Sequence, residues 1–174
     1  NLILMIMEST NEKKIFEVAE IQLSYKSKVK ASMRPKITGS KDAHNILRQY
    51  WDTDKLELVE QFKVMLLNRA NQVIGLLDLS TGSTTGTIAD PRLIFCTALK
   101  GNACGIIVAH NHPSGNLSAS QADIALTNKL KEAGKFLEIQ LLDHIIITAD
   151  SYTSFADEEA VSKVMRRLFS FLTA

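Results

Sequence analysis

The sequence predicts an α/β domain in which helices flank a central mixed β-sheet. Two β-like runs, 60–67 and 73–79, are separated by a short polar turn of hairpin length. A continuously apolar segment, 103–109, has the composition of a strand that is covered on both faces. Segments with helical periodicity alternate with these runs, and such alternation favours helices packed on the faces of a sheet.

The chain length and composition fit a single globular domain with short appendages. The chain has 174 residues, of which 45% are hydrophobic and 22% are charged, so disordered and collagen-like classes are excluded. The net charge of +1 argues against a protein that works mainly by neutralising phosphates. The apolar run at 2–7 is far too short to span a membrane, and it lacks the flanks of a signal peptide. We therefore expect a cytoplasmic protein with no membrane association.

The sequence divides into three parts. Residues 1–34 are expected to form an N-terminal helix, over 10–24, and the start of a basic connector. The main domain covers 35–157 and a helical tail covers 158–174. A helical pattern runs over 156–172. The two terminal segments are expected to pack on the domain or to mediate self-association as a homo-oligomer.

A basic stretch at 26–41 carries six Lys and Arg residues and no acidic residue. The favoured interpretation is a solvated connector, and the alternative is a nucleic-acid contact surface. Few aromatic residues are interleaved with the charges, which favours the first interpretation.

The remaining elements follow in order along the chain. A short helix is expected over 40–51, and a second over 90–100, with Asp90 as its N-cap and Pro91 at its first position. A third helix is expected over 118–134, closed by Gly134. Its apolar candidates are Ile124, Leu126 and Leu130. Two further strands are expected at 136–142 and 144–148, separated by Asp143.

The cysteines give a weaker signal. Cys96 and Cys104 are too few for a disulfide framework and do not form a Cys-x-x-Cys pattern. They are expected to be buried thiols in a reducing compartment.

Three potential metal ligands cluster around the polar loop 111–117. His110 and His112 alternate at the end of the buried strand, so both imidazoles point to one side. Asp123 lies near the start of the following helix, where the free amides favour a carboxylate. Two nitrogens and one oxygen supply three of the four usual ligands of zinc and leave one position open, which is typical of a catalytic site.

Each of these residues also has a structural interpretation. Two histidines at this spacing can decorate an exposed strand, although the preceding run is too apolar for one. Ser118 and Gln121 can form a capping box, with Asp123 as a charge at the helix start.

The spacing His110-x-His112-x7-Ser120-x2-Asp123 resembles the signature of the JAMM (MPN+) metallo-hydrolases. The segments 110–115, 123–127 and 142–146 are similar to those of the RadC family of bacterial proteins, as is the Gly/Ser/Thr-rich loop before Asp90. The resemblance covers roughly residues 35–155. It implies a JAMM/MPN-like, cytidine-deaminase-like three-layer fold, a Zn²⁺ cofactor and a bacterial cytoplasmic protein.

The resemblance also implies roles for residues outside the ligand set. A glutamate on the first strand serves as general base in the family, and Glu60 matches it by position, with Glu57 as a second candidate. Ser120 is implied to stabilise the developing oxyanion, a role compatible with helix capping. Asp143 and His144 either orient a ligand or bind substrate, or they are a strand-start aspartate and a hydrogen-bonded histidine.

The leading hypothesis is a zinc-dependent hydrolase that cleaves an amide or isopeptide-like bond in a peptide or protein substrate. The alternative is a RadC-type accessory protein of DNA repair or mobile elements that binds nucleic acid or a protein partner without hydrolysis. The zinc deaminase pattern His-x-Glu with Pro-Cys-x-x-Cys is absent from the sequence, as is a phosphate-binding Gly-x-x-x-x-Gly-Lys loop. His110-Asn-His112 is not an HNH nuclease motif, because the residues of that motif lie far apart in sequence.

Overall fold

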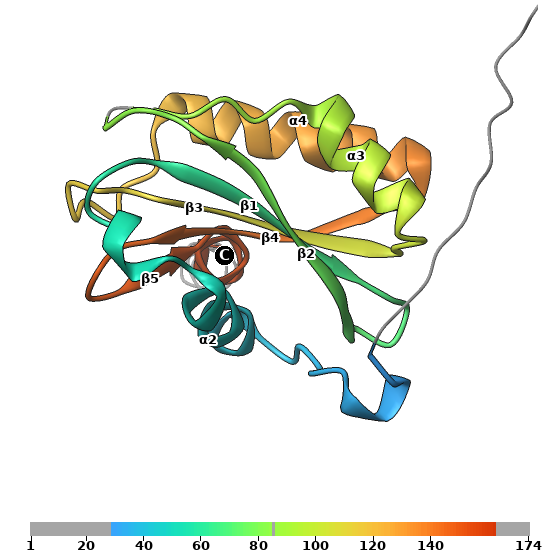
Figure 1. Ribbon diagram of the computed structural model, residues 1–174. Coiled ribbons are helices and arrows are strands. Elements are labelled where there is room, and N and C mark those ends of the chain that lie inside the picture. The colour runs from blue at the N-terminus through green and yellow to red at the C-terminus, as the bar shows by residue number, and fades with distance from the viewer. Residues whose placement is uncertain (1–28, 85, 163–174) are drawn as a thin grey trace, which may run out of the picture.

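The computed structural model describes residues 29–84 and 86–162, which form three layers, with one sheet between two layers of helices (Figure 1). Helix α2 (Ser40–Tyr50) covers one face of the sheet, and α3 (Pro91–Lys100) and α4 (Gln121–Leu137) cover the other. The strand order is β2-β1-β3-β4-β5. The strands are β1 (Gln61–Leu67), β2 (Val73–Thr81), β3 (Gly105–Asn111), β4 (Gln140–Ile147) and β5 (Tyr152–Ser154). The predicted α/β fold with a flanked central sheet is confirmed.

The sheet is mixed. Strand β1 pairs antiparallel with both β2 and β3, and β4 pairs antiparallel with β5. Strands β3 and β4 run parallel, and α4 is the crossover that such a pair requires. The turn between β1 and β2 is tied by Asn68, whose side-chain oxygen accepts from the amides of Ala70 and Gln72. The predicted hairpin is therefore confirmed.

Two hydrophobic clusters fill the spaces between the layers. Because neighbouring residues of a strand point to opposite faces, Ile107 and Ala109 of β3 pack toward α2, whereas Ile106 and Val108 pack toward α3 and α4. Every residue of β3 is buried, as expected for a strand covered on both faces. This alternation directs His110 toward α4 and Asn111 toward the opposite side of the sheet.

The ends of α3 follow the predicted capping chemistry. The Asp90 carboxylate accepts from the Arg92 amide at 2.9 Å, Pro91 occupies the first turn, and Gly101 is the C-cap. Helix α2 matches its prediction to within one residue and buries Ala43 and Leu47.

The region from α4 to β4 differs from the prediction. Helix α4 does not close at Gly134 but continues to Leu137, and Glu138 adopts the left-handed conformation that ends it. Gly134 is required because a Cβ atom there would overlap the carbonyl oxygen of Ile139. Strand β4 is a single strand that includes Asp143, so the prediction of two strands split at this residue is wrong. Ile124 is exposed rather than a core residue, whereas Leu130 is fully buried.

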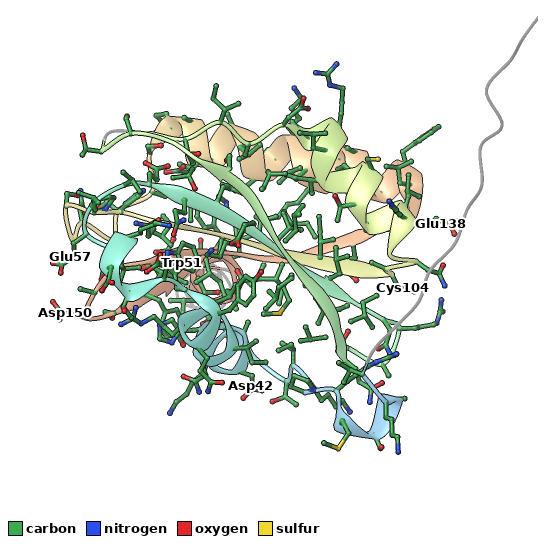
Figure 2. All side chains as sticks on the ribbon, viewed as in Figure 1. Asp42, Trp51, Glu57, Cys104, Glu138 and Asp150 are labelled. Atoms are coloured by element: carbon green, nitrogen blue, oxygen red, sulfur yellow. The ribbon has the colours of Figure 1, made fainter. Side chains whose placement is uncertain are left out.

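Both cysteines are exposed, so the prediction of buried thiols is also wrong. Cys104 lies at the margin of the molecule, close to the end of α4 that Glu138 marks (Figure 2). Short 3-10 helices occur at Ala31–Met33 and Thr53–Lys55. The predicted helix over 10–24 lies outside the described residues, and the helix that begins at Phe155 is described as far as Ser162. No helix in the described part of the chain is long and apolar enough to cross a membrane.

Candidate metal centre

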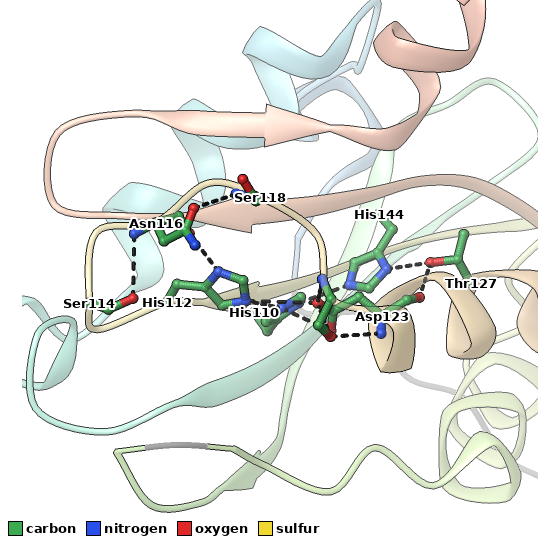
Figure 3. Close-up of polar contacts among 9 residues, drawn as sticks. His110, His112, Ser114, Asn116, Ser118, Asp123, Thr127 and His144 are labelled. Atoms are coloured by element: carbon green, nitrogen blue, oxygen red, sulfur yellow. Dashed lines mark hydrogen bonds and ion pairs between the residues drawn. The ribbon is translucent and has the colours of Figure 1, made fainter.

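Three side chains with metal-ligating atoms meet where β3 ends and α4 begins (Figure 3). His110 is the penultimate residue of β3, His112 follows the strand, and Asp123 lies in the first turn of α4. The amide of His112 donates to the carbonyl of Ile147 on β4, which keeps the chain in register beyond the end of β3. Gly115 then reverses the loop with a φ of 77°, a conformation that favours glycine.

The candidate ligating atoms lie close enough together to hold one metal ion. The Nε2 atoms of His110 and His112 lie 2.9 Å apart. Asp123 Oδ1 lies 3.3 Å from His110 Nε2, and Asp123 Oδ2 lies 3.9 Å from His112 Nε2. Metal–ligand bonds of about 2.0–2.1 Å in a tetrahedron separate neighbouring ligand atoms by about 3.3 Å. The residues present therefore fit a Zn²⁺ ion with one coordination position left open.

A chain of buried hydrogen bonds fixes the tautomer of His110. The Thr127 hydroxyl donates its single proton to the carbonyl oxygen of Asp123 at 2.6 Å, so it accepts from His144 Nδ1 at 2.7 Å. Neutral His144 then carries no proton on Nε2, which accepts from His110 Nδ1 at 2.9 Å. His110 Nε2 is consequently left with a free lone pair that points at His112 and Asp123.

The proton of His112 is also directed away from the site. Its Nδ1 lies 2.6 Å from the carbonyl oxygen of Asn116, which can only accept, so Nδ1 carries the proton (Figure 3). The unprotonated Nε2 atoms of the two imidazoles and the carboxylate of Asp123 thus face one another, and neither imidazole places a proton between them. Such an arrangement attracts a cation, and the oxygen and two nitrogens are ligands that zinc commonly takes.

Burial keeps the two inner histidines neutral. Both rings are almost inaccessible, and Phe62 stacks on His110 while Phe155 stacks on His144. Burial lowers the pKa of His110 to about 4, although the charge of Asp123 acts in the opposite direction. Burial lowers the pKa of His144 to about 3. Neutral imidazole is the form that binds metal, so the shift at His110 favours its ligating state at neutral pH. The shift at His144 keeps that ring neutral, so its Nε2 can accept from His110 Nδ1.

Glu60 lies immediately before β1 and next to this cluster. The pairing of Phe62 with His110 brings the start of β1 beside the end of β3. Burial raises the pKa of Glu60, and the Asp123 charge adds to this effect, whereas His112 and a hydrogen bond from the Thr87 backbone oppose it. A carboxylate with a raised pKa is a stronger base, which suits a group that accepts a proton from water. Glu57, the second candidate, is exposed on the preceding turn (Figure 2).

Ser120 and Asp123 form the capping box of α4. The Ser120 hydroxyl donates to Asp123 Oδ2 at 2.7 Å and accepts from the Asp123 amide at 3.1 Å. The carboxylate in turn accepts from the Ser120 amide. Burial alone would raise the pKa of Asp123, but the Ser120 bonds, with an electrostatic contribution from the nearby His110 ring, bring it below its usual value. The box therefore involves Ser120 and Asp123, not Ser118 and Gln121, and the cap fixes the orientation of the candidate ligand.

The pair Asp143 and His144 serves two different purposes. His144 Nε2 contacts Nδ1 of His110, on the side of that ring away from the cluster. This contact corresponds to the alternative in which the pair orients a metal ligand. Asp143 faces away from the cluster, and its carboxylate accepts from Ser154, from the Ala156 amide and from the His144 amide. The contacts of Thr127 and Asn116 were not predicted, because a hydroxyl four residues beyond Asp123 and a loop carbonyl leave no distinctive pattern in the sequence.

Comparisons with known proteins identify a family to which this chain is similar. The family model described as a RadC-like JAB domain matches residues 37–160. A UPF0758 protein of Flavobacterium johnsoniae is 44% identical over 143 residues, which cover 81% of this chain and 61% of the relative. A UPF0758 protein of Clostridium botulinum is 36% identical over 152 residues, which cover 87% of this chain and 65% of the relative. The matched part of this chain thus spans less than two thirds of each of these relatives.

Proposed function

This chain belongs to the family of RadC-like JAB domains, and we propose that it is a zinc-dependent hydrolase that cleaves an amide-type bond in a peptide or protein. His110, His112 and Asp123 would hold the metal ion, with Glu60 as general base and Ser120 beside the site. The family match supports a metallo-hydrolase type of fold. The residues of the cluster support the chemistry.

One observation carries the proposal. Each of His110 and His112 donates a hydrogen bond from Nδ1 to a partner outside the cluster, so neither ring carries a proton on Nε2. The two Nε2 lone pairs therefore face each other at 2.9 Å, with a carboxylate beside them. Without a positive charge between them these atoms would repel one another. A structural role for two histidines requires no such convergence, and their ordinary hydrogen-bond needs are met better apart.

The chain's own residues would divide the chemistry among them. A bound zinc ion supplies Lewis-acid chemistry, in that it acidifies water and polarises a carbonyl oxygen. The Glu60 carboxylate would take a proton from the attacking water as its oxygen bonds to the carbonyl carbon. It would then pass that proton to the amine nitrogen as the carbon–nitrogen bond breaks. The raised pKa of Glu60 makes its carboxylate a stronger base for the first of these transfers.

Ser120 is placed for a supporting role. Its hydroxyl proton is directed to Asp123 Oδ2, so in this state it stabilises the carboxylate rather than a substrate oxygen. Rotation of the hydroxyl would present the same proton to an oxyanion at the open side of the cluster. Ser120→Ala would then lower kcat more than metal affinity.

The test combines metal content with activity. Elemental analysis should find one zinc ion per chain in the wild type and none in His110→Ala or Asp123→Ala. Glu60→Gln should retain zinc and lose hydrolysis of peptide or isopeptide substrates identified from a proteome-derived library. A wild type that binds no zinc, even when zinc is supplied, would refute the proposal.

Nucleic-acid binding through the basic stretch stays a prediction. Lys30, Lys36 and Lys41 are exposed, but part of this stretch belongs to the fold, because Lys36 pairs with Gln72 beside the hairpin turn. Binding to duplex DNA that disappears at moderate salt, and with these lysines reversed to glutamate, would support it.

A further inference from the structure

The structure assigns Asn111 as the positioning residue that holds Glu60 at the metal centre, an inference that rests on the proposed role of Glu60. Asn111 lies between the two histidines in sequence, but its side chain points to the opposite face of the sheet, so it has no part in the ligand set. It is completely buried.

The Asn111 amide binds both peptide groups that flank Glu60. Its Oδ1 accepts from the Gln61 amide at 2.7 Å. Its Nδ2 donates to the carbonyl oxygen of Val59 at 2.9 Å and to that of Leu56 at 2.6 Å. The Val59 carbonyl belongs to the peptide group before Glu60, and the Gln61 amide belongs to the one after it. One side chain thus fixes the backbone on each side of the proposed base.

The other backbone groups of this residue are held from the opposite direction. The Glu60 amide donates to the Ser83 carbonyl at 2.9 Å, and the Glu60 carbonyl accepts from the Gly82 amide at 2.8 Å. These bonds tie Glu60 to the end of β2, whereas Asn111 ties it to β3. The Asn111 bonds tie the peptide groups on both sides of the base to the strand that carries His110, and so help to set where the carboxylate lies relative to the metal ligands.

The residue type fits this task. A buried side chain that must accept from one amide and donate to two carbonyls requires an oxygen and an NH₂ group on one short stem, which asparagine supplies. Aspartate would keep the acceptor for Gln61 but lose both donors, and its charge would face two carbonyl oxygens. Alanine would lose all three bonds.

The experiment compares Asn111→Ala and Asn111→Asp with the wild type, all loaded with zinc. Hydrogen–deuterium exchange of segment 56–61 should accelerate at least about tenfold in Asn111→Ala, because three buried hydrogen bonds are lost. In Asn111→Asp the Gln61 amide should stay protected while its neighbours accelerate. Asn68→Ser is the matched control, because Asn68 makes similar bonds at the far end of β1 and its loss should leave segment 56–61 unchanged.

A double-mutant cycle separates positioning from simple structural support. Asn111→Asp should lower kcat with little change in KM when Glu60 is present, and it should have no further effect in the Glu60→Gln background. Zinc content should equal that of the wild type in each variant. If Asn111→Ala does not fold, Asn111→Asp carries the test.

Unchanged exchange in segment 56–61, or loss of zinc together with the faster exchange, would overturn the assignment. Exchange and zinc content are measured without a substrate. A protein that shows the expected exchange and retains zinc but hydrolyses nothing would therefore refute the proposed function while supporting the positioning role.

Discussion

Thr127→Val tests the hydrogen-bond chain behind the metal centre with the smallest possible change in shape. Thr127 is buried, and its hydroxyl links the carbonyl of Asp123 to Nδ1 of His144. Valine fills the same space but leaves the Nδ1 proton of His144 without an acceptor. The His144 proton can then move to Nε2 of the same ring, where it would clash with the proton on His110 Nδ1. To avoid this clash, His110 must carry its proton on Nε2, which points into the candidate metal centre.

The expected magnitudes follow from these contacts. A buried donor left without a partner costs about 1–3 kcal/mol. For a chain of this length, a loss of about 2 kcal/mol lowers the melting temperature by roughly 4–8 °C. Loss of a partner that orients a metal ligand typically weakens metal affinity by roughly 10- to 100-fold. Both effects should appear together in the metal-free melting temperature and in a competitive zinc titration.

Thr97→Val is the matched control. The Thr97 hydroxyl also donates to the carbonyl four residues earlier in its helix, at 2.9 Å, but it contacts no histidine and lies on α3. This variant should melt within a few degrees of the wild type and bind zinc equally well. If Thr127→Val is folded and binds zinc as tightly as Thr97→Val does, the assignment of the tautomers is wrong.

Two further predictions concern stability. In the metal-free protein, His110 and His144 remain neutral well below the pKa of about 6.5 that they have when unfolded, because their folded pKa values are about 4 and about 3. The unfolded state binds these protons first, so the free energy of unfolding should fall as the pH drops below about 6.5, by about 1.4 kcal/mol per histidine at about pH 5.5. Urea denaturation at two pH values measures this, and equal midpoints would contradict it. Gly134→Ala should destabilise the fold by about 1–3 kcal/mol, because the new methyl group overlaps the Ile139 carbonyl, whereas Gly39→Ala enters open space and should be nearly neutral in the same thermal melt.

The parts of the fold that follow local rules could be predicted from the sequence. The β1–β2 hairpin, the fully buried strand β3 and the capped start of α3 each leave a signal within a short stretch of sequence. The His-x-His pattern placed both imidazoles at one strand end for the same reason, since a period of two is a local property.

The errors arose where distant partners decide the outcome. Asp143 was predicted to interrupt a strand, but Ser154 and Ala156 satisfy its carboxylate, and these residues lie 11 and 13 positions further along the chain. Gly134 was predicted to end a helix, but the close approach of Ile139 is the reason for a glycine there. Asn111 gave no signal in the sequence, because its three partners precede it by 50 residues or more.

The distribution of the centre along the chain has a consequence for how such proteins diverge. The three candidate ligands, together with Thr127 and His144, all belong to the single β3–α4–β4 unit, whereas the proposed base Glu60 precedes the first strand of the hairpin. On the proposed function, metal capture and proton transfer would therefore be encoded in separate modules. A substitution near the hairpin would then produce a descendant that keeps its metal as a stabilising cross-link but has lost catalysis, so that the two properties would be inherited independently.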